Sequence, residues 1–394
     1  MPDGLRYLPL SEASEEEDAL CGVLSQSLNV SSDRWPAFVA ALGRENLRVL
    51  RRNGRVIGGL GLYRMGQWFG GRCLPCAGIS VVGIAPGERG QGAAAFLMRA
   101  ALEELHAGGT PLSALFASTQ RLYRRVGYEQ AGNRCFHELQ LSAIGEMERP
   151  LPIVALPIDD FRPFEALARE RARITNGNLE RTPGLWRRVL SFPDQTVYAC
   201  AIGTAECPEG YVIYYQKSGQ PGPFKLCIRD FAALSPGAAS SLWAFLRDHR
   251  SVAESVVWFG PANEPLLNLT EECRVRRSEY DHRWLLRVID VRRALEGRGY
   301  PAGVTGELHL EIIDELLAAN SGRFVLKVVD GCGEVGPGGR GDLRAHVRGL
   351  APLYTGLFTP AILRTTGQIA ADDRAISTAT RLFAGPEPWM AEMF

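Results

Sequence analysis

The feature that most constrains this chain is a strand, a glycine-rich loop and a helix that follow one another directly between residues 81 and 106. An apolar run ends at Pro86, the loop contains Gly90 and Gly92, and residues 95–106 are predicted to form a helix. The first N–H groups of a helix have no intrahelical partners, and the helix dipole adds partial positive charge there. Glycines have no Cβ, so a phosphate can approach the backbone closely. The segment therefore predicts a site for a phosphate-bearing ligand.

Three other interpretations of this loop have to be weighed. A P-loop would need Lys followed by Ser or Thr after the glycines, and neither is present. A dinucleotide-binding loop would need a third glycine, where Ala95 stands at best. A glycine turn without any ligand is the usual meaning of such a loop in isolation. The apolar strand before the loop, Arg89 and a matching downstream segment favour the ligand site.

That downstream segment, residues 114–128, is typical of an apolar strand, a short helix and a glycine turn. The helix carries Tyr123, and Gly127 and Tyr128 follow it. A phenol has an ordinary pKa of about 10, so Tyr123 could pass a proton to a departing thiolate. The alternative is that Tyr123 is a half-buried aromatic that only packs. Its spacing from the Arg89 loop favours the catalytic interpretation.

The length of 394 residues predicts two or three domains. The 44 basic and 44 acidic residues cancel, which gives no electrostatic argument for nucleic acid or an anionic membrane as partner. No apolar run is long enough to span a membrane, and residues 1–4 show no signal pattern. The nine cysteines are scattered, which suits reduced thiols, and the six histidines show no metal-ligand spacing. We expect a cytoplasmic protein without a bound metal.

An internal repeat appears at a spacing of about 150 residues. Residues 210–215 echo residues 58–63, and residues 226–236 echo the strand that leads to Pro86. In the second copy, residues 237–240 stand where the first has residues 89–92, and the Arg and the glycines are missing. We expect the same fold without the cofactor, with a weak second site as the alternative.

The last part of the chain is predicted to be an α+β unit. Strands are expected at residues 306–313, 322–329 and 342–347, and helices near residues 350–357 and 374–383. At the other end of the chain, residues 14–17 have the spacing of a capping box that opens the first helix.

The spacing from Arg89 to Gly92 and Ala94 resembles the pyrophosphate-binding signature of Gcn5-related N-acetyltransferases. The whole chain resembles the Eis family, named for enhanced intracellular survival. The most specific matches are residues 284–288, 294–300 and 349–354 and the terminal Phe394.

The resemblance implies a mixed α+β chain with two tandem acetyltransferase-fold domains, the second degenerate, and a domain like sterol carrier protein. The expected divisions are residues 1–148, 149–289 and 290–394. The resemblance also implies a homohexamer.

The resemblance further implies acetyl-CoA as co-substrate and assigns site residues. The main chain of Val82, Gly83 and Ile84 would hold the pantetheine and the thioester carbonyl. Ser118 and Thr119 would contact the pantetheine from the neighbouring strand. Tyr123 matches the general acid of the family, and the carboxylate of Phe394 matches its general base. The pyrophosphate contacts would be Arg89, Gly90, Gln91, Gly92, Ala93, Ala94 and Ala95.

The amine pocket is expected to involve Leu28, Val30 and Trp35. Well-known family members have an acid in this loop and another as the penultimate residue, where Met393 stands here. A polycationic aminoglycoside would therefore meet less opposing charge.

The expected function is acetyl transfer to a primary amine, borne by a small molecule, an aminoglycoside-like compound or a lysine side chain. No Ser or Cys lies in a nucleophile motif, so direct transfer is expected. The alternatives are a non-catalytic acyl-CoA-binding or scaffolding protein, and a carrier of apolar ligands that uses the last domain.

Overall fold

The structure is a computed structural model that describes residues 4–204, 206–219, 222–270 and 275–394. The chain forms two compact units. The first comprises Met1–Gly132, Trp284–Pro386 and Met393–Phe394, and the second comprises Asn133–Arg283 and Glu387–Glu392. The chain thus returns to the first unit at Trp284, and its last two residues belong there as well. The expected domain boundaries at residues 148 and 289 stay a prediction.

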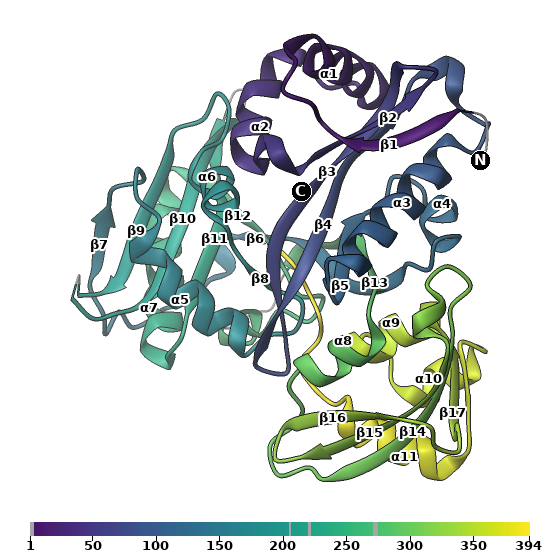
Figure 1. The fold of residues 1–394 in the computed structure, drawn as a ribbon. Helices are drawn as coiled ribbons and strands as arrows, with labels where there is room; N and C mark the ends of the chain where they lie inside the picture. Colours follow the sequence, from purple (N-terminus) through teal and green to yellow (C-terminus); the bar gives the residue numbers. More distant parts are fainter. Residues whose placement is uncertain (1–3, 205, 220–221, 271–274) are drawn as a thin grey trace. The chain divides into compact units, whose positions relative to one another are not determined.

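The N-terminal part of the first unit is a twisted sheet with the strand order β1-β2-β3-β4-β5-β13 (Figure 1). Neighbours from β1 to β4 are antiparallel, β5 is parallel to β4, and β13 is antiparallel to β5. The elements are β1 (Leu5–Pro9), α1 (Ser14–Leu28), α2 (Trp35–Leu42), β2 (Leu47–Arg52), β3 (Arg55–Phe69), β4 (Arg72–Ile84), α3 (Ala93–Ala107), β5 (Leu112–Phe116) and α4 (Gln120–Arg124). Strands β6 (Glu129–Gln140) and β13 (Val275–Val288) are each divided between the two units.

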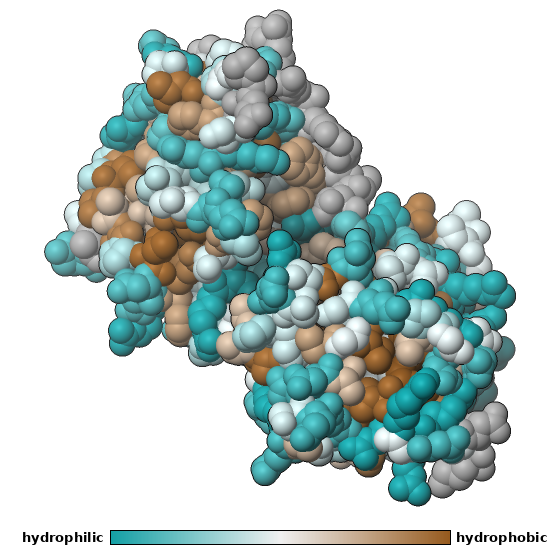
Figure 2. Space-filling view, turned by 90° about the horizontal axis from the view of Figure 1, so that it is seen from above, coloured by the Kyte–Doolittle hydropathy of each residue, from teal (hydrophilic) through white to brown (hydrophobic). Residues whose placement is uncertain are grey.

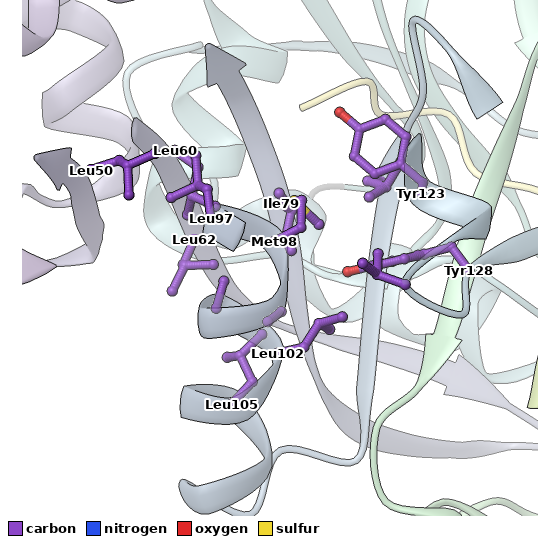
Figure 3. Packing of buried hydrophobic residues seen from close by; sticks show 14 of the residues in the cluster. Leu50, Leu60, Leu62, Ile79, Leu97, Met98, Leu102, Leu105, Tyr123 and Tyr128 are labelled. Atoms are coloured by element: carbon purple, nitrogen blue, oxygen red, sulfur yellow. The ribbon is translucent and has the colours of Figure 1, made fainter. Parts of the chain in front are cut away.

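Helix α3 forms because its apolar residues recur on one face. Leu97, Met98, Ala101, Leu102 and Leu105 are all buried, as the spacing of an amphipathic helix requires. They pack against side chains of the sheet in one apolar cluster (Figure 3). The packing fixes α3 and so fixes the loop that precedes it. The helix begins two residues earlier than the sequence predicts.

The predicted capping box at the start of α1 is wrong. The helix begins at Ser14, so Ala13 is the N-cap residue, and no side chain caps it among the described residues. The carboxylate of Glu16 instead accepts a hydrogen bond from the main-chain N–H of Ser11 at 2.8 Å and pairs with Arg51. The chain is thus held at this point by Glu16, one residue before the glutamate of the predicted box.

The second unit repeats the hairpin, helix and parallel strand of the first. Strands β10 and β11 form an antiparallel hairpin, α7 follows, and β12 returns parallel to β11, as β3, β4, α3 and β5 do in the first unit. The predicted repeat is therefore present in the fold. The elements are β7 (Ile153–Leu156), α5 (Arg162–Arg173), β8 (Leu179–Glu180), α6 (Pro183–Leu190), β9 (Val197–Gly203), β10 (Pro208–Gly219), β11 (Gly222–Ala233), α7 (Pro236–Arg247) and β12 (Ala253–Gly260).

The remaining part of the first unit has a second sheet, with the order β16-β15-β14-β17-β18. The strands predicted at residues 306–313 and 322–329 are confirmed in full, whereas β16 and β18 were not expected. The elements are α8 (Val291–Gly297), β14 (Gly306–Ile313), β15 (Gly322–Val329), β16 (Cys332–Pro337), β17 (Leu343–His346), α9 (Val347–Thr355), α10 (Pro360–Thr365), β18 (Ile369–Ala371) and α11 (Asp373–Leu382).

In the part of the chain that the structure describes, no helix is both long and apolar enough to cross a membrane. The face drawn in Figure 2 shows hydrophobic residues interspersed with hydrophilic ones. The exposed large hydrophobic side chains include Ile174 after the end of α5, Ile313 on β14, Val329 on β15 and Ile362 on α10. Surface hydropathy thus singles out no single element as a binding face.

Candidate active site

The site is built on a fork between β4 and β5, defined as the point after Gly78 and Ala114 where the two strands separate. Three parallel pairs join the strands, Cys76 with Leu112, Ala77 with Ser113 and Gly78 with Ala114. Strand β4 continues to Ile84, beyond the last residue that β5 pairs with. Beyond the fork β5 does not pair with β4, so a ligand that carries its own amides can approach this edge of β4.

A β-bulge interrupts β4 just beyond the fork. Gly59 pairs with Gly83 and Gly61 pairs with Ser80, so Val81 and Val82 together oppose one residue of β3. Val81 has a φ of 48°, which is rare and strained for a β-branched residue. A bulge leaves one residue outside the ladder and bends the strand locally. Of the predicted contacts, Val82 lies in this bulge, and Gly83 and Ile84 follow it directly.

The loop between β4 and α3 is an open cradle. Gly90 and Gly92 have φ values of 77° and 83°, and a Cβ built on either would meet no atom within 4 Å. Gly92 is the N-cap residue of α3, and among the described residues no side chain caps the helix. The N–H groups of Ala93, Ala94 and Ala95 therefore lie at a bare helix start. These N–H groups suit a pyrophosphate, because they lie at the positive end of the helix dipole and the two glycines leave open space in front of them.

Arg89 and its surroundings anchor the cradle. The Arg89 guanidinium donates from Nε to the carbonyl oxygen of Ile84 at 3.2 Å and from Nη2 to that of Ser27 at 3.3 Å. The Ser27 hydroxyl donates to the same Ile84 oxygen at 2.9 Å. Across the loop, Arg52 donates to Glu88 at 2.5 Å and to Gln91 at 2.8 Å. Ser27 and Arg52 belong to no recognisable motif, and neither was predicted from the sequence.

Helix α4 places Tyr123 beside the fork. Thr119 is its N-cap residue, and both Ser118 and Thr119 are exposed on the segment that leads from β5 into the helix. The Tyr123 ring is 6% exposed and packs edge-on against Tyr128, with ring centroids 6.1 Å apart. Burial raises the pKa of Tyr123 to about 12. In Figure 3 the Tyr123 hydroxyl lies at the upper end of its ring, away from Leu102 and Leu105. It has no hydrogen-bond partner among the described residues.

Tyr128 joins Tyr123 to the fork. The Ser113 hydroxyl donates to the carbonyl oxygen of Ala77 at 2.8 Å, so its own oxygen is left to accept the Tyr128 hydroxyl at 2.7 Å. The main-chain N–H of Tyr128 donates to the carbonyl oxygen of Tyr123 at 3.1 Å. Tyr128 and Ser113 are fully buried. The position of Tyr123 is thus tied to the last rungs of β4 and β5.

Phe394 lies at the same fork. Its ring centroid is 5.9 Å from those of Tyr63 on β3 and Phe116 on β5. A Cβ built on Gly78, the last residue of β4 that pairs with β5, would be 2.6 Å from the Phe394 ring. Gly78 is therefore the residue that lets the terminal ring approach the backbone of the sheet. Phe394 thus joins a site whose other members lie more than two hundred residues earlier.

Comparison with known proteins agrees with this architecture. Residues 7–131 and residues 177–288 each match a model of the acetyltransferase (GNAT) domain, and residues 291–391 match a model of the sterol carrier protein domain. A crystal structure of a GCN5-related N-acetyltransferase from Anabaena variabilis superposes with a TM-score of 0.94. It is 40% identical in sequence, over 99% of this chain and 100% of that one. The chain belongs to the GCN5-related N-acetyltransferases.

Within this family the acetyltransferase is Eis-like. N-acetyltransferase Eis of Mycobacterium tuberculosis is 29% identical over 325 residues, which are 76% of this chain and 75% of that protein. Eis1 of Mycobacterium abscessus has the same fold, with a TM-score of 0.83 and 24% identity over 99% of this chain and all of that one. Two acetyltransferase domains and a C-terminal sterol-carrier-like domain are confirmed, as is the expectation of an acetyltransferase enzyme. The family implies acetyl-CoA as co-substrate.

The predicted amine-pocket residues lie at the first two helices of the acetyltransferase. Trp35 begins α2, and its indole N–H donates to Glu17 on α1 at 3.1 Å. Its ring lies 5.6 Å from that of Phe38, which in turn lies 6.4 Å from that of Tyr63, a neighbour of Phe394. A row of rings therefore connects Trp35 to the terminus. Leu28 and Val30 are exposed, at 37% and 45%, around the end of α1.

The second domain lacks this cradle because its own residues fill the corresponding position. The Ser235 hydroxyl caps α7 by accepting from the N–H of Ala238 at 3.1 Å, and Pro236 has no N–H to offer. The same hydroxyl donates to Glu209, which brings a carboxylate to the helix start. A capped terminus beside a negative charge does not suit a phosphate. The expected degeneracy of the second domain is thus explained by these contacts.

Proposed function

We propose that this acetyltransferase transfers an acetyl group from acetyl-CoA directly to a primary amine while both substrates are bound. The observation that carries the proposal is that two groups able to move protons are both tied to the fork. Tyr123 is linked to it through Tyr128 and Ser113, and Phe394 packs on Gly78 at its last rung. Holding two reactants beside such groups supplies much of the rate of a transfer reaction.

Acetyl-CoA supplies the acetyl group as a thioester. The bare start of α3 and the open space at Gly90 and Gly92 support a pyrophosphate site made by Arg89 and residues 90–95. The bulged end of β4 supports main-chain contacts from Val82, Gly83 and Ile84 to the pantetheine and the carbonyl. Preorganised N–H groups there stabilise the negative charge that develops on the carbonyl oxygen. Ser118 and Thr119 border the same ligand from the segment after β5.

Each of the two proton-handling groups has one task. The carboxylate at Phe394 accepts a proton from the amine, and the Tyr123 hydroxyl donates one to the departing thiolate. With a pKa raised to about 12 by burial, the Tyr123 phenol is protonated at neutral pH, as a proton donor requires. Glu392 is the nearest other carboxylate in the tail. It forms an ion pair with the buried Arg181 and is therefore engaged elsewhere.

The acceptor is a primary amine on a small molecule or a lysine side chain. Trp35, Leu28 and Val30 supply aromatic and apolar surface, and no acid stands at residues 28–30. A polycation such as an aminoglycoside is therefore a weaker acceptor than an amine with an apolar body. By family resemblance the enzyme assembles as a homohexamer, and sedimentation velocity tests this state.

The test is thiol release from acetyl-CoA, measured with and without each amine of a panel. The panel contains an arylalkylamine, a lysine-containing peptide, spermidine and kanamycin. We expect amine-dependent thiol release with at least one member and the largest kcat/KM with an apolar amine. Binding of acetyl-CoA without amine-dependent release from any member would overturn the proposed reaction.

A further inference from the structure

Helix α4, which carries Tyr123, is too short to fix its own orientation. It has five residues, and a helix of that length is marginal in water without outside contacts. The contacts at its C-terminal end therefore decide where the phenol points. One of them comes from the sterol-carrier-like domain, and the other comes from Arg287 of β13, which Asp314 of that domain binds. All of these residues lie within the same compact unit.

The first contact is a carboxylate bridge at Glu129, five residues beyond the end of α4. Glu129 Oε1 accepts hydrogen bonds from Arg124, the last residue of α4, at 3.0 and 2.6 Å. Its Oε2 accepts from Arg348 on α9 of the sterol-carrier-like domain at 3.1 and 2.7 Å. Burial opposes ionisation of Glu129, but the hydrogen bonds from both arginines prevail and lower its pKa. The Glu129 carboxylate therefore links α4 of the N-terminal acetyltransferase domain to α9 of the sterol-carrier-like domain.

The second contact lies under the turn that ends α4. Gly127 has a φ of 91°, and a Cβ there would be 2.7 Å from Nε of Arg287. Arg287 is fully buried and binds Asp314 through Nη2 at 2.7 and 2.6 Å. Asp314 follows β14 of the sterol-carrier-like domain and also accepts the main-chain N–H of Leu317. The turn between α4 and Tyr128 therefore packs against Arg287, and Asp314 of the sterol-carrier-like domain holds the guanidinium group of Arg287 in place.

We propose that the sterol-carrier-like domain positions Tyr123, with Arg348 acting through Glu129 and Arg124 as the main link. The inference rests on the proposed function of Tyr123 as proton donor. Arg124 and Arg348 are 39% and 40% exposed, whereas the Glu129 side chain between them is 7% exposed. The two arginines therefore compensate the charge of a buried carboxylate. The two guanidinium groups also fix the orientation of the Glu129 carboxylate, because Arg124 binds one of its oxygens and Arg348 binds the other. Arg348 is a positioning residue that does not touch the substrates.

The experiment is a double-mutant cycle between Arg348→Met and Tyr123→Phe. Arg348→Met keeps an apolar stem and removes the charge, and we expect kcat to fall about tenfold because the donor is misplaced. KM for acetyl-CoA should stay as in the wild type, and the unfolding temperature should fall only slightly, because Arg124 still pairs with the buried Glu129. In the Tyr123→Phe background the same change should have no further effect, since the group it positions is gone. Arg348→Lys, which keeps the charge, should restore most of kcat.

Arg364→Met is the matched control, because it removes an exposed ion pair with Asp373 in the same domain. It should leave kcat unchanged. Should Arg348→Met fail to fold, Glu129→Gln carries the same cycle. A wild-type kcat in Arg348→Met, or an equal loss in both backgrounds, would overturn the positioning role. A wild-type rate in Tyr123→Phe alone would instead reject the proton donor, and the inference with it.

Discussion

At the scale of single residues, the site depends on backbone conformations more than on side-chain chemistry. Gly90 and Gly92 adopt positive φ at no steric penalty and leave the cradle open. Val81 adopts a similar φ against its own preference, which marks the bulge beside the fork as a place where strain is retained. Only Tyr123, Phe394 and Arg89 are proposed to contribute through functional groups.

Gly92→Val tests the cradle. The valine would project into the open space beside the bare start of α3, and its Cβ would also strain a φ of 83°. We expect acetyl-CoA affinity to fall by at least tenfold in calorimetry. Gly87→Val is the matched control, because a Cβ there also meets open space while its φ is not positive. Equal affinity in the two variants would reject the pyrophosphate assignment.

Tyr123→Phe tests the proton donor. The ring and its packing on Tyr128 are kept, while the hydroxyl is lost. Turnover should fall by about 10²–10⁴-fold with acetyl-CoA affinity little changed, as for a lost general acid. A phenol whose pKa is raised to about 12 is active while protonated, so its contribution is lost only as pH rises toward that value. A pH profile in which kcat declines near pH 10 in the wild type alone would contradict the assignment.

At the scale of elements, sequence reasoning succeeded where one local pattern decides the outcome. Strands β14 and β15 follow from apolar patterning between turn residues, and the cradle follows from glycines at a helix start. It failed at the start of α1, where Glu16 bonds Ser11 rather than closing a box. The bulge at Val81 could not be predicted from the sequence, since valine is among the residues least suited to positive φ. The fork depends on the register of two strands, which no single segment encodes.

The two corresponding helices, α3 and α7, predict one cofactor site per chain. The start of α3 is bare, whereas α7 is capped by Ser235 with Glu209 beside it. Titration with acetyl-CoA should therefore give a stoichiometry close to one. Ser235→Ala, which removes the cap, should leave that number unchanged because Glu209 and Pro236 remain. Two sites in the wild type would show that the second domain still binds the cofactor.

At the scale of the whole molecule, the C-terminal tail is divided between the two compact units. Within the second unit, Asn178 donates to the carbonyl oxygen of Trp389 at 2.9 Å, and Arg134 donates to that of Ala391 at 2.9 Å. Glu392 forms its ion pair with Arg181 there. Met393 and Phe394 belong to the first unit. Sequence reasoning placed Phe394 at the site through family resemblance, but nothing in the sequence indicates how residues 387–392 are held.

Adding three glycines after Phe394 tests the terminal carboxylate without changing a side chain. The Phe394 ring can keep its contacts with Tyr63 and Phe116, while the carboxylate moves several ångströms away. An amine is mostly protonated at neutral pH, so losing the group that takes its proton should slow transfer by about 10²-fold or more. Acetyl-CoA should bind as before, because the cradle lies at the start of α3.

Three glycines placed at the N-terminus serve as the control for that extension and should not change the rate. Glu392→Gln separates the remaining candidate from Phe394. Its carboxylate is bound to Arg181, so we expect this variant to retain most of kcat and to lose thermal stability, because Arg181 would be left buried with one partner fewer. Full activity in the C-terminally extended enzyme together with an inactive Glu392→Gln would move the proton acceptor from Phe394 to Glu392.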